Sequence, residues 1–299
     1  MPTAPKKQGA LQYRTPAKLT LVLKVLGRRA DGFHDVKLAL VPVSIYDFII
    51  FLPGETNVRL EVFGPEDLGP PENNLVYRAA MAYQEAAGVP VRGILRLIKH
   101  IPSGAGLGGG SGNAAATLVA LDRLHGHRLG AVRLREIALG LGSDVPFFLE
   151  PRPQWAEGRG ERLTPLPDLP RLHLIVVKPA FPISTAEAYG QVRPRERRAG
   201  VPELTTPGQV LRAMENDFEA ALFPRYPELA RIKTRLLEAG ALGALLSGTG
   251  SALFGVFADA AQRDAAALRL RGQPGWAVHP CESLASHDYE AVCLGPDGT

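Results

Sequence analysis

The alternation of apolar and polar residues predicts strands in the first third of the chain. Four segments alternate in this way or are rich in β-branched residues: 18–27, 36–53, 57–64 and 92–102. Residues 27–34, between the first two segments, are polar and predict a turn. We expect the second segment to break near Pro42, because proline cannot donate a hydrogen bond to a strand ladder.

Helical spacing of apolar residues predicts the remaining elements. The expected helices are 73–88, about 111–125, 134–149 with a break at Gly142, 208–221 and 227–239. In the second helix Ala114, Leu118 and Leu121 share one face, which we expect to point inward. Segments 171–179 and 243–257 indicate a strand and a strand–loop–strand. Strands and helices are mixed rather than strictly alternating, which indicates an α+β fold.

The length of 299 residues favours two domains over one core. The proline-rich segment 165–170 is the best boundary, so we expect domains at 1–165 and 166–299. The net charge is only +4, from 34 basic and 30 acidic residues. This slight excess is compatible with an anionic ligand but does not indicate a nucleic-acid partner.

Cysteine usage and hydropathy indicate a cytoplasmic protein. Cys281 and Cys293 are the two cysteines, and neither has partners at zinc-ligand spacing. The first residues lack the apolar core of a secretory signal, and no apolar run is long enough for a membrane span. We therefore expect no membrane partner, no structural metal and a reducing compartment.

A glycine-rich segment, PSGAGLGGGSG at residues 102–112, stands directly before a predicted helix. Glycines let the backbone approach a ligand closely, and a helix N-terminus presents unpaired N–H groups with a partial positive charge. Together they predict a cradle for phosphate. Ser111 or Asn113 could cap the helix. A flexible linker is the alternative, but linkers do not usually join a strand to a strong helix.

The sequence excludes one known type of phosphate-binding loop and disfavours another. No Gly-Lys-Ser/Thr follows, so the segment is not a Walker A loop. Gly104, Gly106 and Gly109 match the dinucleotide-binding pattern G-x-G-x-x-G, which would also need an acidic residue at the end of a second strand. The acid near that spacing, Asp122, falls inside a predicted helix. A dehydrogenase therefore stays a minor alternative.

Three longer segments of the chain resemble motifs of a known enzyme family. Residues 102–116 resemble the nucleotide loop of the GHMP kinases, and residues 16–34 and 246–257 are similar to two further motifs of the 4-diphosphocytidyl-2-C-methyl-D-erythritol kinase family. Shorter matches follow in the expected order at 141–149, 158–166 and 215–219. The resemblance implies a two-domain GHMP kinase fold. Its N-terminal domain would be like ribosomal protein S5 domain 2, its C-terminal domain would be a ferredoxin-like α/β unit, and the site would lie in the cleft between them.

The resemblance implies ATP, Mg²⁺ carried with ATP, and transfer of the γ-phosphate to the 2-hydroxyl of a small-molecule acceptor. The protein would act as a monomer or weak homodimer. Asp144 matches the catalytic aspartate of the family and Lys18 matches the lysine that would keep this carboxylate ionised. From the residues alone, a helix cap would be the better interpretation of Asp144. Whether it acts as a base or as an electrostatic anchor stays open.

The same resemblance implies where the ligands bind. The ATP phosphates would be wrapped by the nucleotide loop, formed by Pro102, Ser103, Gly104, Ala105, Gly106, Leu107, Gly108, Gly109, Gly110, Ser111 and Gly112. The acceptor carries a cytidine. His34 would hydrogen-bond the edge of its cytosine, Phe33 would stack or pack beside the base, and Tyr189 would lie against the face of the base. Thr20 would also bind this substrate, through a hydrogen bond. The backbone of Gly248, Thr249 and Gly250 would lie near its diphosphate.

Four positions depart from the family pattern. Thr20 stands where asparagine is usual, Phe33 where tyrosine is usual, Gly112 where serine is usual, and Ser143 where alanine is usual. These departures bear on specificity and rate more than on the fold.

Two further alternatives stay open. A GHMP kinase for another alcohol, such as homoserine or mevalonate, is disfavoured by the segment GRRADGFH at 27–34. A nucleotide-binding protein without catalysis is disfavoured by the presence of both Lys18 and Asp144.

Overall fold

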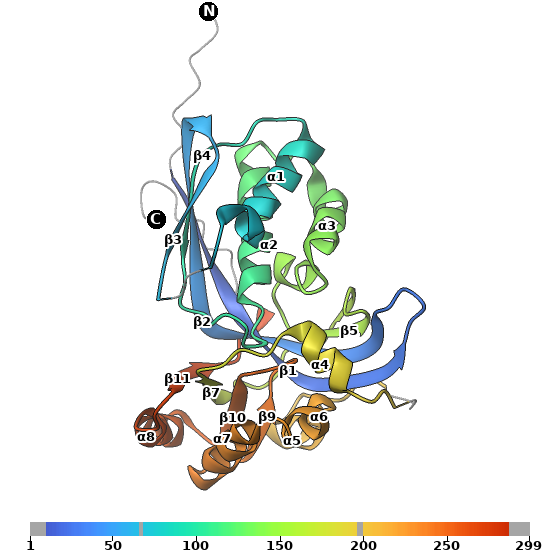
Figure 1. Ribbon diagram of the computed structural model, residues 1–299, viewed down its shortest axis with the longest axis vertical. Coiled ribbons are helices and arrows are strands. Elements are labelled where there is room, and N and C mark those ends of the chain that lie inside the picture. Colours follow the sequence, from blue (N-terminus) through green and yellow to red (C-terminus); the bar gives the residue numbers. More distant parts are fainter. Residues whose placement is uncertain (1–9, 66–67, 196–199, 287–299) are drawn as a thin grey trace, which may run out of the picture.

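The computed structural model describes residues 10–65, 68–195 and 200–286. A first sheet of seven strands has the order β3-β4-β2-β1-β8, with β5 and then β6 attached through β2. Two long strands, β1 and β2, form an antiparallel hairpin that runs down the first sheet and then bends towards the lower right of the view (Figure 1). The strands of this sheet are β1 (Leu11–Arg28), β2 (His34–Asn57), β3 (Arg59–Phe63), β4 (Arg92–Ile98), β5 (Gln154–Gly158), β6 (Arg162–Pro165) and β8 (Glu215–Asn216).

The expected break at Pro42 is wrong, because β2 continues through this residue. Pro42 pairs with Lys18 of β1, whose backbone N–H points away from β2 and donates to Leu107. The nitrogen of Pro42 therefore also points away from β1. On that side neither β5 nor β4 pairs with β2 at this residue, and the chain after β11 makes an isolated bridge in which Leu284 donates its N–H to the carbonyl of Pro42. Since no continuous ladder needs a donor from Pro42, the strand tolerates proline.

Three helices cover one face of the first sheet (Figure 1). The predicted inward face of α2 is confirmed, because Ala114, Leu118 and Leu121 are fully buried. Asn74 caps α1 through its side chain, and Gly88 ends that helix in the left-handed conformation. These elements are α1 (Leu75–Ala87), α2 (Gly109–Leu124) and α3 (Gly130–Leu141), with the short 3₁₀ helices η1 (Pro71–Asn73) and η2 (Pro146–Leu149).

A second, fully antiparallel sheet has the order β11-β7-β10-β9. This order, with helical connections after β7 and β10, is the ferredoxin-like arrangement expected for the second half of an α+β kinase. The elements are β7 (His173–Pro179), β9 (Gly243–Leu246), β10 (Leu253–Phe257), β11 (Trp276–Glu282), α4 (Thr185–Gln191), α5 (Pro207–Ala213), α6 (Phe218–Leu222), α7 (Pro227–Glu238) and α8 (Ala260–Arg271).

The helix predicted over 208–221 is wrong in its middle. The chain leaves α5 at Met214, forms the short strand β8 and re-enters a helix at Phe218. The strand pairs in parallel with β1, where Asn216 lies opposite Leu23. Tertiary pairing therefore overrides a helical pattern that is continuous in the sequence.

The two sheets are joined along β2. Val43 bridges to Ser283, directly after β11, and Ser44 accepts a hydrogen bond from the backbone of Glu282. The predicted domain boundary falls between β6 and β7, which belong to different sheets; the boundary itself stays a prediction. Cys281 is a buried free thiol in β11, and Cys293 lies outside the described residues. Among the described residues, no helix is long and apolar enough to cross a membrane.

Candidate active site

The glycine-rich segment forms a tight turn between β4 and α2. Gly106 adopts a positive φ of 73°, and a Cβ atom there would lie 2.1 Å from the carbonyl oxygen of Ser247. Gly108 also has a positive φ and is the residue that caps α2. Because glycine alone fits these positions, the loop brings its backbone against the neighbouring chain and aims the first turn of α2 into a cavity.

The expected side-chain cap of α2 is wrong. Gly108 occupies the cap position without a side-chain hydrogen bond, and the helix begins at Gly109, two residues before Ser111. Ser111 instead lines the cavity. Asn113 is buried and donates its amide to Asp47 at 2.8 Å. The N–H groups of the first helical turn are therefore left to a ligand, as an anion site requires.

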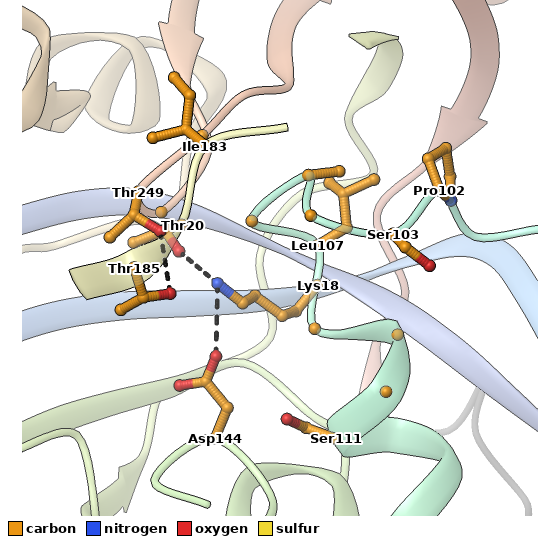
Figure 2. Close-up of a pocket in the computed structure, with 18 of the residues that line it drawn as sticks. Lys18, Thr20, Pro102, Ser103, Leu107, Ser111, Asp144, Ile183, Thr185 and Thr249 are labelled. Atoms are coloured by element: carbon orange, nitrogen blue, oxygen red, sulfur yellow. Dashed lines mark hydrogen bonds and ion pairs between the residues drawn. The ribbon is translucent and has the colours of Figure 1, made fainter. Parts of the chain in front are cut away.

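Lys18 and Asp144 face each other across this cavity (Figure 2). The Nζ atom of Lys18 lies 3.8 Å from Oδ2 of Asp144 and donates to the Thr20 hydroxyl at 3.2 Å. The lysine side chain is 6% exposed, whereas the aspartate is 38% exposed. The pair therefore places a buried cation beside a carboxylate that a ligand can reach.

Local structure explains both positions. Lys18 lies in the middle of β1, and its backbone N–H is tied to Leu107 of the glycine loop at 2.9 Å. Asp144 follows the end of α3 at Gly142, where the predicted break is confirmed, and precedes Pro146 at the start of η2. A carboxylate in such a break is not enclosed by a helix and can project into the cavity.

The loop between β9 and β10 closes the cavity from the second sheet. Ala252 donates its backbone N–H to Ala105 at 3.1 Å, and the Ser247 hydroxyl donates to Gly106 at 3.2 Å. The predicted residues Gly248, Thr249 and Gly250 line the cavity. The hydroxyls of Thr249 and Thr185 lie 3.5 Å apart and connect this loop to α4 (Figure 2). Two motifs, whose contacting residues Gly106 and Ser247 are 141 positions apart in the sequence, thus form one continuous wall.

A second, larger cavity of about 860 Å³ adjoins the first and shares Ser111, Asp144, Arg159, Thr185 and Tyr189 with it. His34 and Tyr189 stack in its wall, with ring centroids 4.8 Å apart and an angle of 27° between the rings. Phe33 is 48% exposed and lines the same cavity. The two cavities therefore form one cleft, with a phosphate-loop end and an aromatic end.

Burial sets the protonation of the two stacked rings. Burial lowers the pKa of His34 below its ordinary value, and the charge of Arg28 lowers it further. Burial, followed by the charge of Asp144, raises the pKa of Tyr189. At neutral pH both rings are uncharged. They present flat faces and a hydrogen-bonding edge, which suits a heteroaromatic base.

A buried polar network supports the start of the glycine loop. Asp47 is fully buried and accepts hydrogen bonds from Nζ of Lys99 at 2.6 Å and from the backbone N–H groups of His100 and Ile101. Lys99 lines the phosphate end of the cleft. With Asn113 bound to the same carboxylate, Asp47 fixes both the residues before the loop and the helix after it.

Most residues predicted for the site line the cleft. Gly112 does not, because it lies one turn inside α2, where a Cβ atom would be 3.3 Å from the ring of Phe148. The roles predicted for the lining residues stay predictions. Sequence reasoning missed Lys99, Arg159 and Thr185, which line the cleft, and the supporting Asp47. Arg159 alone had a signal, since it falls inside one of the matched segments.

The dinucleotide-binding alternative has no structural support. Asp122 is buried within α2, where it accepts hydrogen bonds from Tyr83 and from the backbone N–H of Leu129. This acid stabilises helix packing and does not reach the cleft, so it cannot bind a ribose there.

Comparisons with known proteins agree with this geometry. Residues 74–150 match the model for the GHMP kinases N terminal domain, and residues 201–274 match the model for the GHMP kinases C terminal. A 4-diphosphocytidyl-2-C-methyl-D-erythritol kinase of Symbiobacterium thermophilum is 42% identical over 279 residues, 90% of this chain and 99% of that protein.

Solved structures extend the comparison. A crystal structure of 4-(cytidine 5'-diphospho)-2C-methyl-D-erythritol kinase matches 92% of this chain and 100% of its own, with a TM-score of 0.75 and 35% identity. A homoserine kinase from Cytophaga hutchinsonii matches 95% of this chain and 96% of its own, with a TM-score of 0.68 but 18% identity. The second likeness concerns the fold alone.

Proposed function

Because this chain belongs to the GHMP kinases and, within them, to the 4-diphosphocytidyl-2-C-methyl-D-erythritol kinase family, we propose that it phosphorylates that cytidyl alcohol in the non-mevalonate isoprenoid pathway. ATP supplies the γ-phosphoryl group, and the 2-hydroxyl of the methylerythritol unit receives it. The single observation that carries the proposal is the continuous cleft. It joins the glycine loop and the Lys18–Asp144 pair to an aromatic wall that fits a cytosine.

The glycine loop and the first turn of α2 bind the phosphates of ATP. Backbone N–H groups at a helix N-terminus stabilise the negative charge of the phosphates, and Ser111 adds a hydroxyl donor. Gly106 and Gly108 let the backbone reach this position without steric conflict. Positioning and charge neutralisation of this kind make up most of the catalysis in phosphoryl transfer.

Asp144 and Lys18 act at the acceptor hydroxyl. Asp144 accepts the hydroxyl proton as the oxygen attacks the γ-phosphorus, whose bond to the bridging oxygen breaks and releases ADP. Lys18, which forms an ion pair with Asp144, stabilises the oxygen anion that develops during transfer. His34 hydrogen-bonds the edge of the cytosine, and Phe33 and Tyr189 contact its faces.

Mg²⁺ would bind together with ATP. Among the described residues, no group of three His, Cys, Asp or Glu side chains could hold a metal ion. Asp144 and Ser111, which line the cleft beside the glycine loop, are oxygen groups that would help to hold a magnesium ion bound mainly by phosphates. When bound, the ion neutralises the charge that develops on the transferred phosphoryl group.

We also propose that the enzyme acts in the cytoplasm on a small molecule. It would be a monomer or weak homodimer, and each chain would have two domains, at 1–165 and 166–299. The small net charge of +4 supports the absence of a nucleic-acid partner. Light scattering at about micromolar concentration tests the oligomeric state.

Turnover of the acceptor tests the function. The purified protein, with Mg²⁺ and ATP, should phosphorylate 4-diphosphocytidyl-2-C-methyl-D-erythritol and leave homoserine and mevalonate unchanged. Asp144→Asn should lower kcat by about 10²- to 10⁴-fold. Asp264→Asn, on the exposed side of α8 and outside the cleft, serves as the matched control. Turnover of homoserine or mevalonate in preference to the cytidyl acceptor would contradict the proposal.

A further inference from the structure

Arg159 lies in the turn between β5 and β6 and lines both parts of the cleft. Its guanidinium carbon is 3.7 Å from the centroid of the Phe33 ring. One guanidinium nitrogen donates to the hydroxyl of Ser143 at 3.4 Å. Ser143 directly precedes Asp144, so the guanidinium spans the distance from the aromatic end of the cleft to its reacting end.

The hydrogen-bonding capacity of Arg159 is largely unused. Its Nε atom is buried without a hydrogen-bond partner among the described residues. No carboxylate of the described chain forms an ion pair with this guanidinium, and the nearby Asp31 is paired with Arg29 at 3.1 Å. A guanidinium has five N–H donors, and the contact with Ser143 uses one of them. A buried donor without a partner is costly, which favours a ligand that completes it.

The shape of the acceptor indicates which group reaches Arg159. In the proposed function, on which this inference rests, the cytosine binds near His34 and the reacting hydroxyl binds near Asp144. The diphosphate connects the two and must cross the cleft between them. Arg159 contacts a residue at each end, so it stands beside that crossing.

We propose that Arg159 binds the diphosphate of the acceptor and thereby selects an acceptor of nucleoside diphosphate type. A guanidinium offers two parallel N–H donors, which match the paired oxygens of a phosphate. Stacking on Phe33 holds the guanidinium plane, and Ser143 fixes one edge, so little side-chain freedom is lost on binding. Both of these partners are positions where the chain departs from its family pattern. Arg28, which also lines the acceptor end, adds a second positive charge.

Paired ligands with and without the diphosphate test the proposal. Calorimetry would compare cytidine 5'-diphosphate with cytidine on the wild type, Arg159→Met and Arg159→Lys. Methionine keeps an apolar contact with Phe33 while it removes the charge. Arg162→Met, on the exposed face of β6 in the same hairpin and outside the cleft, is the matched control.

Arg159→Met should raise the Kd of cytidine 5'-diphosphate about 10- to 100-fold and leave the Kd of cytidine within about twofold. The KM of the cytidyl acceptor should rise by a similar factor, whereas the KM of ATP stays unchanged. The Kd of cytidine 5'-diphosphate for Arg159→Lys should lie between those of the wild type and Arg159→Met, because lysine keeps the charge but not the paired donors. Arg162→Met should behave as the wild type.

Four results would overturn the proposal. Equal losses for cytidine and its diphosphate would show that Arg159 only supports Phe33. Tighter cytidine binding in Arg159→Met would show that the guanidinium occupies the place of the base. Unchanged diphosphate binding in Arg159→Met, with normal wild-type turnover, would overturn this inference and leave the proposed function intact. A wild type that neither binds the diphosphate nor phosphorylates the acceptor would overturn both.

Discussion

The side-chain amide of Asn216 donates to the carbonyl oxygens of Gly248 and Leu246, at 2.8 Å each. Asn216 is 6% exposed and pairs with Leu23 of β1 through the short strand β8. One amide therefore ties the loop that closes the phosphate cavity to the strand that carries Lys18. Asn216 contacts neither cavity, so its effect on activity runs through the position of that loop.

Asn216→Ala should lower the free energy of unfolding by about 1–3 kcal/mol, because two buried carbonyl oxygens lose their donor. The KM of ATP should rise as the loop loosens. Asn216→Asp should be worse than alanine. It keeps an acceptor for the backbone N–H of Phe218 but places a carboxylate against two carbonyl oxygens. Urea unfolding, with ATP kinetics alongside, measures both effects. An aspartate variant as stable as the wild type would contradict the assigned hydrogen bonds.

The closure of the glycine loop can be tested with two glycines of similar conformation. Gly106 and Gly126 have φ angles of 73° and 74°, but a Cβ atom at Gly126 would meet nothing within 4 Å. Gly126→Ala should therefore lower the free energy of unfolding only by the conformational cost of about 1–2 kcal/mol. Gly106→Ala adds the conflict with Ser247. It should lower kcat/KM for ATP on the order of 100-fold. Equal kinetics in the two variants would mean that the approach to Ser247 does not shape the site.

Much of the fold follows from local patterns. The β1–β2 hairpin, the capped helix α1 and the inward face of α2 are all specified by residues that lie close together in the sequence. Pro42 and the segment 208–221 could not be predicted correctly. The reason is that neither β5 nor β4 pairs with β2 at the proline, and pairing with β1 interrupts the helix. Both are contacts with residues far away in the sequence.

The candidate site divides in the same way. The glycine loop, Lys18 and Asp144 lie in contiguous motifs, so the sequence alone points to them. Asp47 lies in the middle of a strand and carries no motif; its importance comes from Lys99 and Asn113, which are distant in the sequence. Arg159 falls inside a matched segment, but its place in the cleft follows from the contact between the β5–β6 turn and Phe33, which are distant in the sequence.

His34 should make stability depend on pH. Its pKa is lowered in the folded protein, first by burial and then by Arg28, so the unfolded chain takes up a proton at higher pH. The contribution of His34 to the free energy of unfolding is complete above the ordinary histidine pKa of about 6.5. It is lost as the pH falls towards the lower pKa of His34 in the folded protein. Urea unfolding of the wild type and His34→Gln between about pH 5 and 8 measures this. The variant should show a smaller decline in the free energy of unfolding below about pH 6.5. Identical declines would contradict a depressed pKa at this position.

Lys18→Met should separate catalysis from stability. The lysine is buried, but its partner Asp144 is 38% exposed and lies 3.8 Å away, so the ion pair contributes at most about 1 kcal/mol to folding. Methionine fills a similar volume, and Thr20 loses only one hydrogen bond. The free energy of unfolding should therefore change by no more than about 1 kcal/mol. The kcat should fall by at least about 100-fold, because the cation no longer stabilises the charge that develops at the acceptor oxygen.

Urea unfolding and steady-state kinetics on the same preparation of Lys18→Met measure both effects. A large loss of stability with a proportionate loss of activity would assign Lys18 a structural role. A stable variant with unchanged kcat would remove it from the catalytic machinery.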